Sequence, residues 1–76
     1  MIQLVNFRVK YGLTQQEMSK KIGTTLTFYS KVELGLRNPS YNFIVKFKKA
    51  FPKVDVDNIF LKFNYTKSVN YNLSYN

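Results

Sequence analysis

Residues 13–35, LTQQEMSKKIGTTLTFYSKVELG, contain the clearest local signals of secondary structure in the chain. Thr14 and Glu17 stand in the T-x-x-E spacing of a capping box, in which two side chains satisfy free backbone N–H groups at a helix start. A Met and an Ile follow four positions apart, so they share one helix face. Gly23 is a typical helix stop. The first half of the stretch therefore predicts a helix that begins after Thr14 and ends at Gly23.

The second half of the stretch, residues 24–35, is rich in residue types that prefer strands. As a strand, however, it would not separate its apolar side chains onto one face. As a helix it does, because one side gathers Tyr29, Val32 and Glu33. The opposite side gathers Thr27, Ser30 and Lys31, with Leu26 at the edge. The spacing predicts a helix with Thr25 as its N-cap and Gly35 at its end.

Three further helices are predicted around these two. Residues 3–11 have apolar residues at helical spacing before Gly12, residues 41–51 follow a Ser cap and precede Pro52, and residues 56–61 follow an Asp cap. The side chains expected to face the core are Leu4, Phe7, Tyr11, Tyr41, Ile44, Phe47, Phe51, Val56, Ile59 and Phe60. Five short helices with short connections predict a compact all-α domain over residues 1–61.

The C-terminal tail, residues 62–76, follows a different pattern. From Leu61 onward apolar and polar residues alternate, which is typical of a β-strand. An all-α body offers such a strand no edge, so it would form a hairpin, pair with a second copy, or stay disordered. If it pairs, the expected dimer contacts are Phe60, Phe63, Tyr65, Val69 and Tyr71.

Composition excludes several classes of protein. The 76 residues contain no Cys, no His and four acidic residues, so metal-dependent or acid–base catalysis is improbable and we expect no enzyme, metal, cofactor or small-molecule ligand. There is no signal-peptide layout and no apolar run of about 20 residues. We therefore expect a cytoplasmic protein that does not enter a membrane. The net charge of +8 indicates a polyanionic partner, with double-stranded DNA first among candidates.

Helix, tight turn, helix is also the arrangement that lays a helix in the DNA major groove. The pattern R-x-x-x-G-L-T-Q-Q-E-M-S-K-K-I-G-T-T-x-x-x-Y-S-K-V-E-x-G-x-R-N-P-S, residues 8–40, resembles the Cro/repressor-type helix-turn-helix of phage and mobile-element regulators, often called Xre-like. The resemblance covers residues 4 to about 61. It implies a lambda-repressor-like fold whose second and third helices form the helix-turn-helix.

The resemblance also implies residue roles, and physical chemistry agrees with them. The base-reading residues would be Leu26, Thr27, Ser30 and Lys31, since Lys can donate to guanine, hydroxyls serve either base and Leu can contact a thymine methyl. Phosphates would be held by Gln15, Gln16, Thr25, Arg37 and Asn38. Arg8 and Glu33 match an internal ion pair. In isolation, Lys31 could equally be a solvated lysine and the two glutamines ordinary first-turn residues.

The sequence as a whole predicts a DNA-binding transcriptional regulator. One such domain makes few base contacts, so we expect a homodimer on a pseudo-palindromic operator with half-sites about 34 Å apart. The alternative is an antitoxin or adaptor that uses the same fold mainly for protein contacts. The sequence does not distinguish repression from activation.

Overall fold

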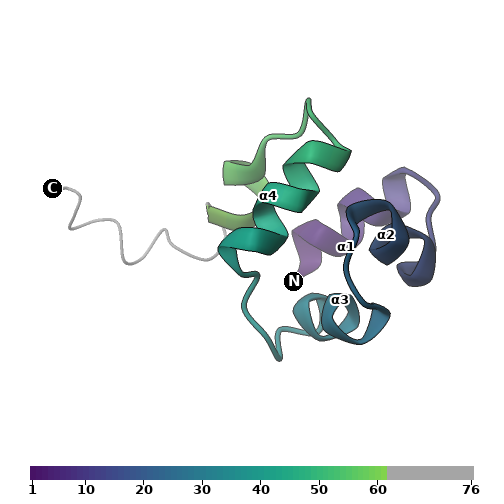
Figure 1. Ribbon diagram of the computed structural model, residues 1–76. Coiled ribbons are helices and arrows are strands. Elements are labelled where there is room, and N and C mark those ends of the chain that lie inside the picture. The colour runs from purple at the N-terminus through teal and green to yellow at the C-terminus, as the bar shows by residue number, and fades with distance from the viewer. Residues whose placement is uncertain (62–76) are drawn as a thin grey trace, which may run out of the picture.

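The computed structural model describes residues 1–61 and consists of helices joined by short loops (Figure 1). The helices are α1 (Ile2–Lys10), α2 (Gln15–Ile22), α3 (Leu26–Glu33), α4 (Tyr41–Ala50) and the π-helical η1 (Asp57–Leu61). The all-α, five-helix fold expected from the sequence is confirmed for this part of the chain. The tail contacts expected at Phe63, Tyr65, Val69 and Tyr71 lie outside the described residues.

Helix α2 begins and ends as its sequence indicates. The Thr14 hydroxyl accepts a hydrogen bond from the Glu17 backbone N–H at 3.0 Å, and the Glu17 carboxylate accepts one from the Thr14 N–H at 2.9 Å. Together these two bonds make the predicted capping box. At the other end Gly23 has φ +91°, and its N–H donates to the Ser19 carbonyl at 2.9 Å. Because residues with a Cβ atom rarely adopt this left-handed backbone conformation, glycine is favoured at the turn.

Helix α3 forms despite its strand-like composition. The Thr25 hydroxyl accepts from the Phe28 N–H at 3.1 Å, so Thr25 is the predicted N-cap. Tyr29, Val32 and Glu33 are buried, as their spacing predicts. Phe28 is partly buried, and its ring lies 5.7 Å from that of Phe43. Burial of this face therefore overrides the weak intrinsic helix propensity.

An aromatic core joins the helices. Phe47 of α4 is fully buried, with ring centroids 5.2 Å from Phe7, 5.4 Å from Phe51 and 5.2 Å from Phe60. Tilted and edge-on ring pairs at these separations add attraction beyond the burial of apolar area. The rest of the buried apolar set is Leu4, Met18, Ile22, Tyr29, Val32, Phe43, Val54 and Ile59. None of the helices in residues 1–61 is long and apolar enough to cross a membrane.

Three sequence expectations need correction. Tyr11 was expected to face the core but is 53% exposed, because it is the C-cap residue beyond the last turn of α1. Tyr41 was expected to face inward but is 83% exposed, because Phe43 is the buried aromatic of this turn. The two residues lie about 200° apart around a helix, so both cannot face the core. Phe60 was expected at a dimer contact, but it is fully buried and its ring lies edge-on to those of Phe43 and Phe47. We therefore assign Phe60 to the core of a single chain.

Candidate nucleic-acid interface

Helices α2 and α3 pack against each other across a three-residue turn (Figure 1). Ser19 is buried between the helices and donates its hydroxyl proton to the Gln16 carbonyl at 2.8 Å. A small side chain at this position allows a close approach of the two helix backbones. The Lys46 ammonium of α4 donates to the Gly23 carbonyl at 3.1 Å and so ties the turn to the rest of the body.

The outer side of α3 carries the four expected base-reading side chains. Leu26 is 42% exposed and Thr27 is exposed, whereas Ser30 and Lys31 are half-buried. They occupy positions i, i+1, i+4 and i+5, which are neighbours on a helix surface; Thr27 and Lys31 lie away from the buried residues of α3, and Leu26 lies at the edge of the buried side. The structure therefore brings these four together as one short polar strip with Leu26 at its start.

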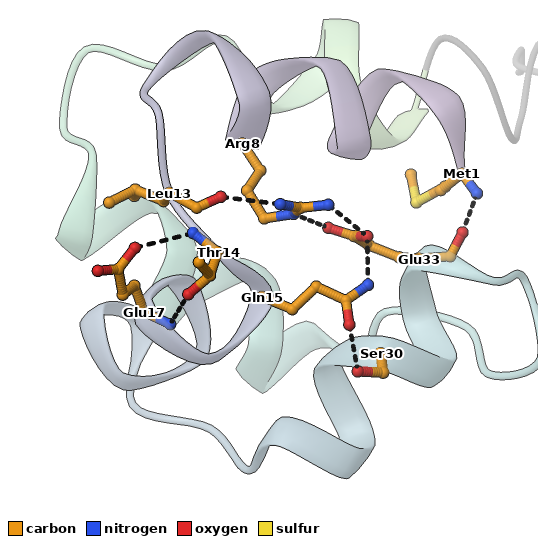
Figure 2. Close-up of polar contacts among 8 residues, drawn as sticks. All are labelled: Met1, Arg8, Leu13, Thr14, Gln15, Glu17, Ser30 and Glu33. Atoms are coloured by element: carbon orange, nitrogen blue, oxygen red, sulfur yellow. Dashed lines mark hydrogen bonds and ion pairs between the residues drawn. The ribbon is translucent and has the colours of Figure 1, made fainter.

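The Arg8–Glu33 ion pair links α1 to the last residue of α3 (Figure 2). The Arg8 Nε donates to one carboxylate oxygen at 2.7 Å and a terminal nitrogen donates to the other at 3.4 Å. The remaining guanidinium nitrogen donates to the Leu13 carbonyl at 2.8 Å. The Glu33 side chain is only 4% exposed, so this pair holds a nearly buried carboxylate.

Gln15 connects this carboxylate to the outer strip of α3 (Figure 2). Its amide nitrogen donates to Glu33 Oε1 at 2.7 Å. Its amide oxygen accepts from the Ser30 hydroxyl at 2.8 Å. The resemblance assigned Gln15 to phosphate contact; here both ends of its amide form hydrogen bonds inside the protein.

The electrostatics of this network keep Glu33 ionised. Burial raises the pKa of Glu33, but hydrogen bonds from Arg8 and interactions with Tyr29 and Gln15 outweigh it and leave the pKa below its usual range. Within residues 1–61 the buried Tyr29 hydroxyl has no hydrogen bond of standard geometry. Burial and the nearby Glu33 charge raise the pKa of Tyr29 well above its ordinary value. The network therefore contains one stable negative charge, matched by the Arg8 guanidinium.

The candidate phosphate contacts lie around the strip. Gln16 and Thr25 are exposed near the first turns of α2 and α3, where free backbone N–H groups favour an anion. Arg37 and Asn38 are exposed in the loop after α3. The Thr25 oxygen caps α3, and its hydroxyl hydrogen is still available to donate. All four side chains are exposed, as a contact to a phosphate group requires.

The two carboxylates in the first fifty residues are both held in internal contacts, Glu17 in the capping box and Glu33 in the ion pair. This part of the chain therefore presents a largely cationic surface to a polyanion. Sequence reasoning missed two contacts: the Met1 ammonium donates to the Glu33 carbonyl, and Lys46 reaches Gly23. Their partners are 32 and 23 residues away, and no local pattern connects them.

The fold and this strip together define a helix-turn-helix protein. A family model described as "Helix-turn-helix" matches residues 4–59. The chain therefore belongs to the helix-turn-helix family of the Xre and lambda-repressor type.

A protein of Archaeoglobus fulgidus described as an uncharacterized HTH-type transcriptional regulator is 40% identical over 45 residues. The match covers 59% of this chain and 64% of the archaeal protein, so the chain spans less than two thirds of that relative's length. No solved structure matches the chain.

Proposed function

We propose that this chain is a sequence-specific regulator of transcription that binds double-stranded DNA through α3. The observation that carries the proposal is the outer strip of α3, in which a hydrophobic side chain, two hydroxyls and a lysine are held on a helix anchored by a buried ion pair. A rigid helix that exposes such side chains fits the major groove, where each base pair has a distinct pattern of donors and acceptors. In this role it would resemble the small Cro-like regulators of phages and mobile elements.

We propose further that it acts as a homodimer on a pseudo-palindromic operator. The exposed strip of α3 offers four side chains to base edges, and operator-grade affinity needs more contacts than one such helix makes. Selection of bound sequences from a random DNA pool tests the whole proposal. An inverted repeat with half-sites about 34 Å apart is the expected result. Recovery of a pool without any sequence preference would contradict it.

Substitution of Lys31 separates base reading from phosphate contact. Lys31→Ala should weaken binding to the selected operator about tenfold and relax the preference at one base pair, because a lysine donates to guanine O6 or N7. Arg37→Ala should weaken binding to all sequences alike and reduce the salt slope by about one unit, as expected for a lost phosphate contact. Fluorescence anisotropy with operator and scrambled duplexes at several salt concentrations measures both. Equal effects of the two variants on both duplexes would argue against the assigned roles.

A protein-interaction module is the second candidate function, in the manner of an antitoxin or adaptor. The observation that favours it is that three large apolar residues between the end of α3 and the start of α4 are exposed: Leu34, Leu36 and Tyr41. Large exposed apolar residues close together are typical of contact surfaces. If the chain recovers no preferred sequence from the DNA pool and Lys31→Ala leaves DNA binding unchanged, while Leu36→Ser abolishes binding to a protein partner, this second function replaces the first.

A further inference from the structure

We infer that Ser30 recognises a base amino group, that of adenine N6 or cytosine N4, because its only hydroxyl hydrogen is directed to Gln15. Gln15 is the positioning residue in this arrangement, and Glu33 fixes Gln15. The inference rests on the proposed DNA binding through α3 and adds to it the chemical class of base at one operator position.

The chain of contacts begins at Glu33, whose nearly buried carboxylate is held by Arg8 (Figure 2). An ionised carboxylate has no hydrogen and can only accept. The group of Gln15 that lies 2.7 Å from it must therefore be the amide NH₂. This contact fixes the orientation of the Gln15 amide, so that its oxygen faces Ser30.

The Gln15 oxygen is in turn an acceptor without a hydrogen. The Ser30 hydroxyl lies 2.8 Å from it and supplies the single hydrogen that this contact requires. A serine hydroxyl has one hydrogen and two lone pairs, so what remains to Ser30 is acceptor capacity. Ordinarily a serine can rotate to donate or accept, which makes it a poor discriminator of bases. Here the network removes that freedom.

Ser30 lies on the same strip of α3 as Leu26, Thr27 and Lys31 and is half-buried at its border with α2. In the major groove, adenine and cytosine present amino donors, whereas guanine and thymine present O6, N7 or O4 acceptors. An oxygen that can only accept forms a hydrogen bond with the amino group of adenine or cytosine. Against guanine or thymine it faces the lone pairs of another acceptor, which repel its own. The ammonium group of Lys31, the next residue, can only donate. Ser30 therefore needs a donor on the base that it contacts, and Lys31 needs an acceptor.

The test uses the operator selected with the full chain and a set of duplexes in which each base pair is changed in turn. Because every base pair contains one amino base, the contacted amino group is identified with analogues that lack it, purine for adenine or 2-pyrimidinone for cytosine. At one position such an analogue should weaken wild-type binding about fivefold, the effect of one lost hydrogen bond, and Ser30→Ala should abolish this difference. Ser30→Thr keeps the hydroxyl and should retain the difference. Gln15→Met removes the acceptor, so Ser30 regains its rotation and the same position should lose discrimination between amino and carbonyl bases.

Asn6→Leu is the control, since Asn6 is an exposed amide side chain on α1 that is outside the proposed DNA contacts and has no hydrogen bond to Glu33 or Ser30 in the described residues. It should leave every base preference unchanged. A fall in overall affinity without a change at one position would indicate a merely structural role for Gln15 and overturn the inference. So would a wild-type chain whose binding no such analogue weakens, or an analogue effect that persists unchanged in Ser30→Ala. A wild-type chain without any sequence preference would instead overturn the proposed function itself.

Discussion

Replacing Arg8 with Met is expected to lower the free energy of unfolding by about 3–5 kcal/mol, the usual effect of removing one partner of a buried ion pair. The Glu33 side chain is 4% exposed, so without Arg8 its charge would be left in a site that water barely reaches. The Leu13 carbonyl would also lose its guanidinium donor. Since small domains are stable by only about 5–15 kcal/mol, this is a large fraction of the total. Urea unfolding followed by circular dichroism measures it.

Two controls distinguish a lost ion pair from a lost side chain. Lys10→Met, at an exposed position of the same helix, should change stability by less than about 0.5 kcal/mol. Adding Glu33→Gln to Arg8→Met should recover much of the loss, because no buried charge is then unpaired. A double variant as unstable as the single one would contradict the assignment.

The loss of stability in the Arg8→Met variant should depend on pH. In the wild type the pKa of Glu33 is lowered, so its contribution to stability is present above the ordinary glutamate pKa and is lost as pH falls through the folded value. Without Arg8, burial dominates and the pKa of Glu33 rises, which favours the neutral carboxyl. The stability difference between the two proteins should therefore be largest near neutral pH and narrow below about pH 4.

The single substitution Phe47→Ala is expected to lower the free energy of unfolding by about 3–5 kcal/mol, the usual range for a buried phenylalanine. Phe47 is fully buried and has three aromatic rings within 5.4 Å of its own, from α1, the end of α4 and η1. The cavity would therefore open where three helical segments meet. Thermal unfolding should show the loss, and Phe47→Leu, which fills most of the volume, should lose less.

Tyr41→Ala is the matched control for this prediction. Tyr41 lies on the same helix and is also aromatic, but it is 83% exposed, so we expect a change within about 0.5 kcal/mol. A large loss for Tyr41→Ala with a small one for Phe47→Ala would reverse the assignment of the inner face of α4. This pair of variants therefore also tests the correction made to the sequence-based expectation.

The features that sequence reasoning located correctly are those with local physical causes. The capping box at Thr14 and Glu17, the glycine turn at Gly23 and the Thr25 cap are each decided by residues no more than a few positions apart. The buried face of α3 follows from helical spacing in the same way. The inner face of α4 was assigned partly wrongly, because Tyr41 and Phe43 are both large aromatics and spacing did not decide which one the neighbouring helices would cover.

The sequence by itself determined the helix order, the helix-turn-helix and the set of side chains on the outer side of α3, since hydrophobic periodicity and capping are local. Only the tertiary structure decided what those side chains can do. Glu33 and Gln15 are 18 positions apart, and Gln15 and Ser30 are 15 apart. Packing of α2 on α3 brings them within hydrogen-bond distance, and the charge on Glu33 then fixes the direction of every hydrogen bond as far as Ser30. Whether a serine donates or accepts depends on its neighbours in space, and those neighbours exist only once the chain has folded.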